Sequence, residues 1–221
     1  ATTMAERVPP GRAGRLWLMG RLDYARRSLE LLDRKHLLLL QELEGLTQAR
    51  AEARQRWTQE CTVAERWGLR AVALGGASDI AVAAAAVAEQ ARVHVPWRNT
   101  MGVVHPGEPG CTLPALPPSE AAAGNAAIAP AAVAQRDALL AAAAFGALDR
   151  SHHLLTVELR ATQRRRRAIE RTRIPSLEAA LERLELRLDE LEREERVVNR
   201  WARQRYGPVV GGSRITPEAA T

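Results

Sequence analysis

The residues able to carry acid–base or metal chemistry are scattered along this 221-residue chain rather than grouped. His152 and His153 are adjacent, so on a helix their side chains would point about 100° apart and could not share a metal ion as an i, i+4 pair does. His94 and His105 could face each other across a short hairpin, where a solvent-exposed pair is a commoner outcome than a site. His36 falls on an apolar helical stripe, where a polar residue more often sets register than binds a ligand. The carboxylates are spread along expected helices, so we predict no catalytic residue and no metal site.

Cofactor-binding motifs are missing as well. The sequence has no Gly-rich run ending in Gly-Lys-Ser or Gly-Lys-Thr, and no Gly-x-Gly-x-x-Gly after an expected strand. The two cysteines, Cys61 and Cys111, form no Cys-x-x-Cys pair, which is typical of neither a disulfide framework nor a zinc site and suits a reducing cytoplasm. We therefore expect no cofactor and no catalytic activity from the chain alone.

The strongest charge run is Arg164 to Arg167. Four consecutive residues cover all sides of a helix, so they cannot form one flat patch. The run is either a solvated helix segment or an electrostatic collar that grips acidic loops of a partner. A net charge of +6 would suit an acidic partner, but among the 32 basic residues only Lys35 is lysine, and we expect most arginines to solvate helix faces. Base-reading aromatic side chains are not interleaved with the run, which disfavours a nucleic-acid interface.

Leucines at spacings of 4 and 3 organise the C-terminal part of the chain. This spacing places them on the stripe that faces a partner helix in a coiled coil. Neither Gly nor Pro occurs from Ser176 to Tyr206, and Gly207-Pro208 is expected to end the helix. The leucines of this seam are Leu177, Leu181, Leu184, Leu188 and Leu191.

A second long helix is expected from about Gly14 to the Gly75-Gly76 pair. Its seam keeps the same spacing over Leu18, Leu22, Ala25, Leu29, Leu32, His36, Leu39, Leu43 and Leu46. Two heptad helices at opposite ends of one chain predict an antiparallel pair, in which residues near 22 meet residues near 198 and residues near 43 meet residues near 177. A homodimer that pairs each helix with its own copy is the competing arrangement.

The middle of the chain differs in composition from the two ends. Residues 92–97 and 101–105 read as two short strands around a turn at 98–100, followed by a Pro-rich loop over 106–118. A further helix is expected from about Ala131. Pro175 lies within its continuation and should kink one long helix, an interpretation that we favour over two separate helices.

The fold class predicted is mainly α: a long antiparallel two-helix coiled coil formed by the N- and C-terminal helices, with a small β-hairpin and loop region in the middle. No run of about 18 apolar residues is present, so no membrane span is expected. The expected divisions are a disordered N-terminus (1–13), the N-terminal coiled-coil helix (14–74), a middle region (75–130) with a hairpin at about 92–105, the C-terminal coiled-coil helix (131–206) and a disordered tail (207–221).

Several stretches resemble the D subunit of the V/A-type rotary ATPases. The family pattern T-R-R-R-V-N-A-L-E, I-P-R-L-E and L-D-E-R-E-R-E-E is similar to Thr162–Glu170, Ile174–Glu178 and Leu188–Glu195 at the same offsets. The N-terminal pattern V-P-P-T and R-L-x-x-A-x-R-G-x-x-L-L-x-x-K is similar to Val8-Pro9-Pro10 and to Arg21-Leu22, Ala25, Arg27, Leu31-Leu32 and Lys35, and Asn99–Val103 resembles the central M-G-V strand. Gly11 replaces the family Thr, Arg166-Arg167 replace Val-Asn, and residues 71–130 match poorly.

This resemblance implies a non-catalytic rotor shaft in the central stalk of a proton-translocating ATPase or ATP synthase. Its implied partners are the A and B subunits of the hexameric head, the F subunit and the C (or d) subunit, with no nucleic acid and no direct membrane span. The implied location is cytoplasmic, peripheral to the cell membrane. Two other functions stay open: a free-standing coiled-coil scaffold or membrane-surface protein, which would form a homodimer, and an Arg-rich nucleic-acid binder, whose affinity would fall steeply with salt.

Overall fold

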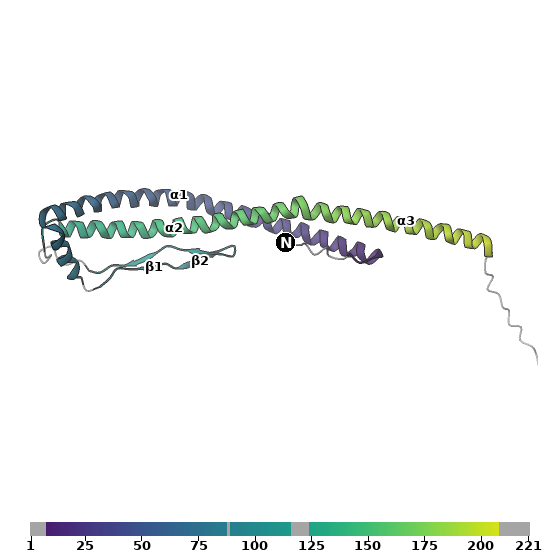
Figure 1. The fold of residues 1–221 in the computed structure, drawn as a ribbon, viewed down its shortest axis with the longest axis horizontal. Coiled ribbons are helices and arrows are strands. Elements are labelled where there is room, and N and C mark those ends of the chain that lie inside the picture. Colours follow the sequence, from purple (N-terminus) through teal and green to yellow (C-terminus); the bar gives the residue numbers. More distant parts are fainter. Residues whose placement is uncertain (1–7, 88, 116–123, 208–221) are drawn as a thin grey trace, which may run out of the picture. The chain divides into compact units, whose positions relative to one another are not determined.

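The computed structural model describes residues 8–87, 89–115 and 124–207. Of these described residues 81% are helical, in two long helical stretches with a small strand-containing middle region between them (Figure 1). The predicted mainly α fold class is thereby confirmed. Most of the predicted disordered ends, residues 1–7 and 208–221, lie outside the described residues, and residues 11–13 are helical. The elements in order are α1 (Gly11–Ala85), β1 (Arg92–His94), β2 (Trp97–Thr100), β3 (Val103–Pro106), β4 (Gly110–Thr112), α2 (Ile128–Ala168), the π turn η1 (Ile169–Arg173) and α3 (Ile174–Tyr206).

The chain divides into two compact units. One combines Ala1–Leu29 with Arg167–Thr221, and the other is Glu30–Arg166. We call them the terminal unit and the central unit. In each unit a part of α1 packs against a helical stretch from the second half of the chain.

In the terminal unit, α1 and α3 pack in antiparallel directions. Leu18, Leu22, Ala25 and Leu177 form its buried core. Arg15 reaches Glu185 at 2.8 Å, and further along α1 Arg26 reaches Glu178 at 2.9 Å. Residue numbers on α3 therefore fall as those on α1 rise, as expected for antiparallel helices. The partly buried residues packed against this core are Trp17, Ile169, Ile174, Ala180, Leu181 and Leu184.

In the central unit, α1 packs against α2 through leucines at one end and alanines at the other. Leu39, Leu43 and Leu155 are buried together, with Val103 of β3 packed against them. Small side chains let two helices approach closely, and the remaining two core clusters are almost entirely alanine. Their buried members are Ala64, Ala134 and Ala138 in one cluster, and Ala71, Ala127, Ile128 and Ala131 in the other.

The predicted helix register is wrong by about three heptads. Leu22 packs with Leu177 rather than with residues near 198, and Leu43 packs with Leu155 rather than with residues near 177. A seam of period 7 looks the same after a shift of any whole number of heptads, so leucine spacing alone cannot choose between such registers. Ion pairs and one aromatic contact are specific to the register observed. Among them is the stacking of Trp57 on Phe145, with ring centroids 5.2 Å apart.

Helix α1 changes direction at the predicted glycine pair. Gly76 has φ 73° and ψ 178°, which interrupts the helical backbone. A Cβ on Gly75 would lie 1.7 Å from Oδ2 of Asp79, so any other residue here would displace the Asp79 carboxylate. Asn125 fixes the bend because its Nδ2 donates to the carbonyl oxygen of Ala71 at 3.0 Å and to Oδ2 of Asp79 at 3.1 Å.

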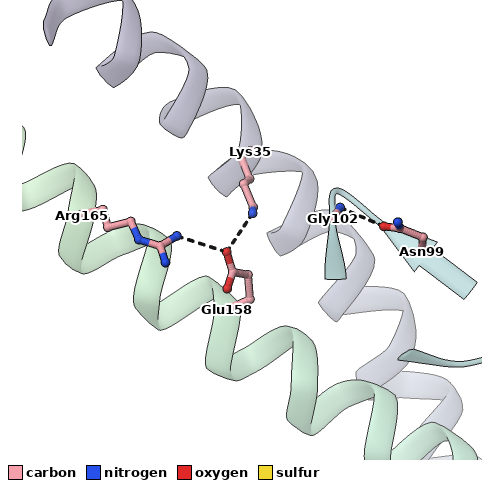
Figure 2. Close-up of polar contacts among 5 residues, drawn as sticks. All are labelled: Lys35, Asn99, Gly102, Glu158 and Arg165. Carbon is pink, nitrogen blue, oxygen red and sulfur yellow. Dashed lines mark hydrogen bonds and ion pairs between the residues drawn. The ribbon is translucent and has the colours of Figure 1, made fainter. Parts of the chain in front are cut away.

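The hairpin is longer than expected, and the predicted turn position is wrong. β2 pairs with β3 from Thr100–Val103 to Trp97–Pro106, which places the turn at Met101 and Gly102 instead of 98–100. Both turn residues have positive φ, 52° and 83°, as a tight two-residue hairpin turn requires. β1 pairs with β4, so part of the predicted loop at 106–118 is a strand. Within the turn, Oδ1 of Asn99 accepts a hydrogen bond from the Gly102 N–H at 2.9 Å (Figure 2).

Around Pro175 the chain stays helical. α2, η1 and α3 follow one another without a break from Ile128 to Tyr206, as the interpretation of one long helix predicts. Pro175 is the second residue of α3, and the irregularity is a π turn of five residues directly before it. Insertion of a π turn is a known cause of helix kinks, beside proline itself.

By length and composition alone, two helical stretches could cross a membrane, contrary to the expectation from the sequence. They are Gly11–Ala85 and Ile128–Arg205, each with an 18-residue window of mean hydropathy 1.3. A core helix of a soluble protein passes the same test, and long runs of alanine raise the hydropathy of both stretches. The same two stretches are joined by ion pairs between charged side chains, including Arg50 with Asp149 at 2.6 Å.

Candidate interaction surfaces

The histidines do not assemble a metal site in the part of the chain that the structure describes, where no group of three or more His, Cys, Asp or Glu could hold a metal ion. His94 lies opposite Gly110 and His105 lies opposite Arg98, so the two histidines do not face each other as expected. His36 is half-buried on the seam, and its Nδ1 has no hydrogen-bond partner among the described atoms.

His105 is instead a buried contact between the hairpin and α2. Only 4% of it is exposed, and Ser151 of α2 is 1% exposed. The Nδ1 of His105 lies 3.2 Å from Oγ of Ser151 and 3.0 Å from the Pro106 carbonyl oxygen, while its Nε2 lies 2.9 Å from Oγ1 of Thr100. Oγ of Ser151 also lies 2.7 Å from the Pro106 carbonyl oxygen, within donating distance. These contacts attach β3 of the hairpin to α2. Nothing in the sequence around Ser151 indicates this role.

A half-buried ion pair joins α1 to α2 near the turn of the hairpin. Nζ of Lys35 lies 2.8 Å from Oε1 of Glu158, with side-chain exposures of 23% and 25%. Arg165 approaches the same oxygen at 3.5 Å from within α2, and Figure 2 shows both cations pointing at the Glu158 carboxylate. The hydrogen bond from Lys35, assisted by the charge of Arg165, holds the pKa of Glu158 below its ordinary value. Lys35 stands out in the sequence because it is the only lysine, but its partner could not be predicted once the register was misplaced.

The arginine run divides into paired and exposed members. Arg165 contacts Glu158, and Arg166 forms an ion pair with Asp33 of α1. Arg164 is exposed, and so is Arg160, which lies one helical turn earlier on the same side of α2. Neither guanidinium has a polar partner among the described residues. Arg166 therefore joins α2 to α1, Arg165 supports the Glu158 carboxylate from within α2, and the exposed positions leave a basic surface on α2.

The end of α3 presents apolar side chains to solvent. Helix α1 begins at Gly11, and Arg12 reaches Glu192 at 3.1 Å, so α3 after residue 192 has no described α1 residue beside it. In this stretch Val197 is 65% exposed, Val198 63% and Trp201 55%. A group of exposed apolar side chains this close together is typical of a surface that contacts another protein.

Comparison with known proteins gives the same assignment along nearly the whole chain. The family model for the D subunit of ATP synthase matches residues 16–204, which include both seams, the hairpin and the arginine run. The chain belongs to this ATP synthase family. A relative in the family, the D subunit of the A-type ATP synthase of Methanopyrus kandleri, is 29% identical over 196 residues, covering 86% of this chain and 82% of the relative.

Membership in the D-subunit family confirms the resemblance drawn from the sequence. It makes the chain a component of a rotary ATPase or ATP synthase, and the surfaces described above are therefore surfaces of one member of a larger complex. The exposed arginines of α2 and the apolar end of α3 are two of the places where the described structure leaves charge and apolar area available to other members of that complex.

Proposed function

We propose that this chain is the non-catalytic rotor shaft in the central stalk of a V/A-type, proton-translocating ATPase or ATP synthase. In this role it couples ATP hydrolysis or synthesis in the head to rotation of the membrane ring. The observation that carries the proposal is the fastening of α1 to its antiparallel partner helices in both units, by apolar seams and by cross-helix ion pairs.

A rotor shaft must transmit torque, and paired helices resist bending and twisting better than one helix does. It must also present different side chains to the catalytic sites as it turns, because coupling requires contacts that favour one conformation over another. The exposed surface of α2 and that of the end of α3 differ in the way that this requirement demands. The exposed arginines of α2 offer positive charge to acidic loops of the head, and the end of α3 offers apolar area.

The proposed partners are the A and B subunits of the hexameric head, the F subunit, and the C (or d) subunit of the central stalk. We place the chain on the cytoplasmic side, peripheral to the cell membrane as part of the complex. Its apolar helical windows are then alanine-rich coiled-coil segments rather than membrane spans. The cross-helix ion pairs support this interpretation, because uncompensated charge is costly within a bilayer.

The test is to tag this chain in its native host, isolate the membranes gently and identify what co-purifies. The proposal expects an ATPase with one copy of this chain per hexameric head. It also expects the chain to remain with the head when mild conditions detach the head from the membrane. A homodimer without any ATPase component would instead support the free-standing scaffold.

A further inference from the structure

Two isoleucines of the terminal unit pack on the same cluster although five residues separate them. Ile169 and Ile174 both contact the core formed around Leu18, Leu22 and Leu177. In an α-helix, five residues at about 100° each rotate the chain by about 500°, so two such side chains would point about 140° apart. They could not both face α1 if the helix were regular between them.

The π turn η1 resolves this mismatch. The N–H of Ile174 donates to the carbonyl oxygen of Ile169, a bond that spans five residues instead of four. A π turn thus holds one residue more than an α turn. From Ile174 onward the seam returns to spacings of 3 and 4, through Leu177, Leu181 and Leu184.

Pro175 offers a second explanation for the π turn, since proline lacks an N–H and clashes with the carbonyl group four residues earlier. That explanation does not account for the spacing of the apolar residues. Ile169 would be one residue out of phase with Ile174 and Leu177 whatever residue occupied position 175. If one residue were removed between them, the spacings from Ile169 onward would become 4, 3, 4 and 3.

We propose that η1 is a phase adapter: it stores one extra residue so that Ile169 and the α3 seam face α1 together. Pro175 then occupies a position that the π turn has already made irregular, where a missing N–H costs less than it does inside a regular helix. This role concerns the packing of the terminal unit and does not depend on the rotor function, so either proposal can fail without the other.

The test compares the full-length chain carrying Pro175→Ala with the same variant from which Thr172 is also deleted. A crystal structure of Pro175→Ala should retain the bond from the Ile174 N–H to the Ile169 carbonyl oxygen. Deletion of Thr172 in that background should give a regular α-helix with the same apolar contacts to α1, and its Tm should stay within about 3 °C of the Tm of Pro175→Ala.

The control deletes Glu182, an exposed residue inside the regular seam of α3, in the same Pro175→Ala background. That deletion moves Leu184 and Leu188 off the seam, so the Tm should fall by more than about 5 °C. The proposal is overturned if Pro175→Ala alone converts η1 into a regular α turn. It is equally overturned if deletion of Thr172 lowers the Tm as much as deletion of Glu182.

Discussion

Among individual residues, Glu158 has the most clearly defined electrostatic environment. Lys35 approaches it from α1 and Arg165 from α2, and about three quarters of the Glu158 side chain is buried. Ion pairs on exposed helix surfaces contribute little to stability, because water screens them and long side chains lose entropy. This pair is partly buried and includes a direct hydrogen bond, so it should contribute more to the stability of the fold than the exposed pair of Arg26 with Glu178. The side chains of that pair are 57% and 47% exposed.

We expect Glu158→Gln to lower the free energy of unfolding by about 1 to 2 kcal/mol at pH 7, since Lys35 would keep a half-buried charge without its carboxylate. The pKa of Glu158 is lower in the folded chain than in the unfolded chain. Its contribution is therefore complete above the unfolded pKa and is lost as the pH falls through the folded value. Urea unfolding measured at pH 7 and at successively lower pH should show the difference between the wild type and the variant shrink in acid.

The matched control is Glu178→Gln, which removes a carboxylate from the more exposed pair. We expect this variant to differ little from the wild type at either pH. Equal losses for the two variants at pH 7, or a difference for Glu158→Gln that does not shrink as the pH falls, would contradict the assignment of a partly buried ion pair at Glu158.

Ser151 supplies polar contacts from α2 to the hairpin. Ser151→Ala removes a hydroxyl that lies within hydrogen-bond distance of both His105 and the Pro106 carbonyl oxygen. Loss of a buried hydrogen bond costs about 1 kcal/mol. We expect thiol labelling of Val103→Cys, measured after Cys61 and Cys111 are changed to serine, to become about fivefold faster in Ser151→Ala, because the hairpin separates from α2 more often.

Thr58→Ala serves as the control for this labelling experiment. Oγ of Ser151 also lies 2.8 Å from the Ala147 carbonyl oxygen in the preceding turn of α2. Thr58 makes the same kind of bond on α1, from Oγ1 to the Arg54 carbonyl oxygen at 2.9 Å, but it is exposed and lies outside the contacts between the hairpin and α2. The labelling rate at position 103 in this variant should equal that of the parent. An unchanged rate in Ser151→Ala would show that apolar contacts alone hold the hairpin.

At the scale of elements, leucine spacing predicted that both ends of the chain are helical and pair in antiparallel directions. It could not predict which heptad meets which, because a shift by whole heptads preserves every seam position. The contacts that distinguish the registers depend on which residues meet, as in the ion pair of Arg15 with Glu185 and the stacked rings of Trp57 and Phe145. Only a search for complementary charge and aromatic pairs across both helices could have found the register from sequence.

The turn of the hairpin was misplaced for a different reason. The segment Arg98–Thr100 was interpreted as the turn because polar residues interrupt two apolar runs there. The position of the turn is decided by the backbone and not by polar side chains. A two-residue turn needs positive φ at two consecutive positions, and Gly102 adopts it without steric cost. Asn99 then caps the turn from the strand. The buried role of His105 could not be predicted either, since it depends on Ser151, which is distant in sequence.

The register itself can be tested by disulfide trapping in a chain whose native cysteines are changed to serine. Cysteines at Leu22 and Leu177 should form an intramolecular cross-link under mild oxidation, because these side chains share one buried cluster. Cysteines at Leu22 and Val198 should not. Efficient cross-linking of the second pair, with little of the first, would restore the register expected from leucine spacing.

At the scale of the whole molecule, the exposed arginines of α2 are the surface most easily tested in the assembled complex. We expect Arg160→Glu combined with Arg164→Glu to leave the helical content unchanged and to lower ATP-driven ion pumping at least about fivefold, the effect of about 1 kcal/mol of lost interaction with an acidic partner surface. Arg54→Glu combined with Arg56→Glu, two exposed reversals on α1, changes the net charge by the same amount and is the control. Full pumping by the double variant would argue against a contact of these arginines with the head.

Rotation of this chain within the complex tests the proposed function most directly. The head would be immobilised through its A or B subunits, and a bead would be attached to this chain at a cysteine placed on the hairpin, for example at Val104, which is 56% exposed. The proposal predicts unidirectional rotation of the bead that starts on addition of ATP and stops when ATP is removed. A bead that stays fixed while the same immobilised complexes hydrolyse ATP and another component of the central stalk turns would contradict the assignment of this chain as the rotor shaft.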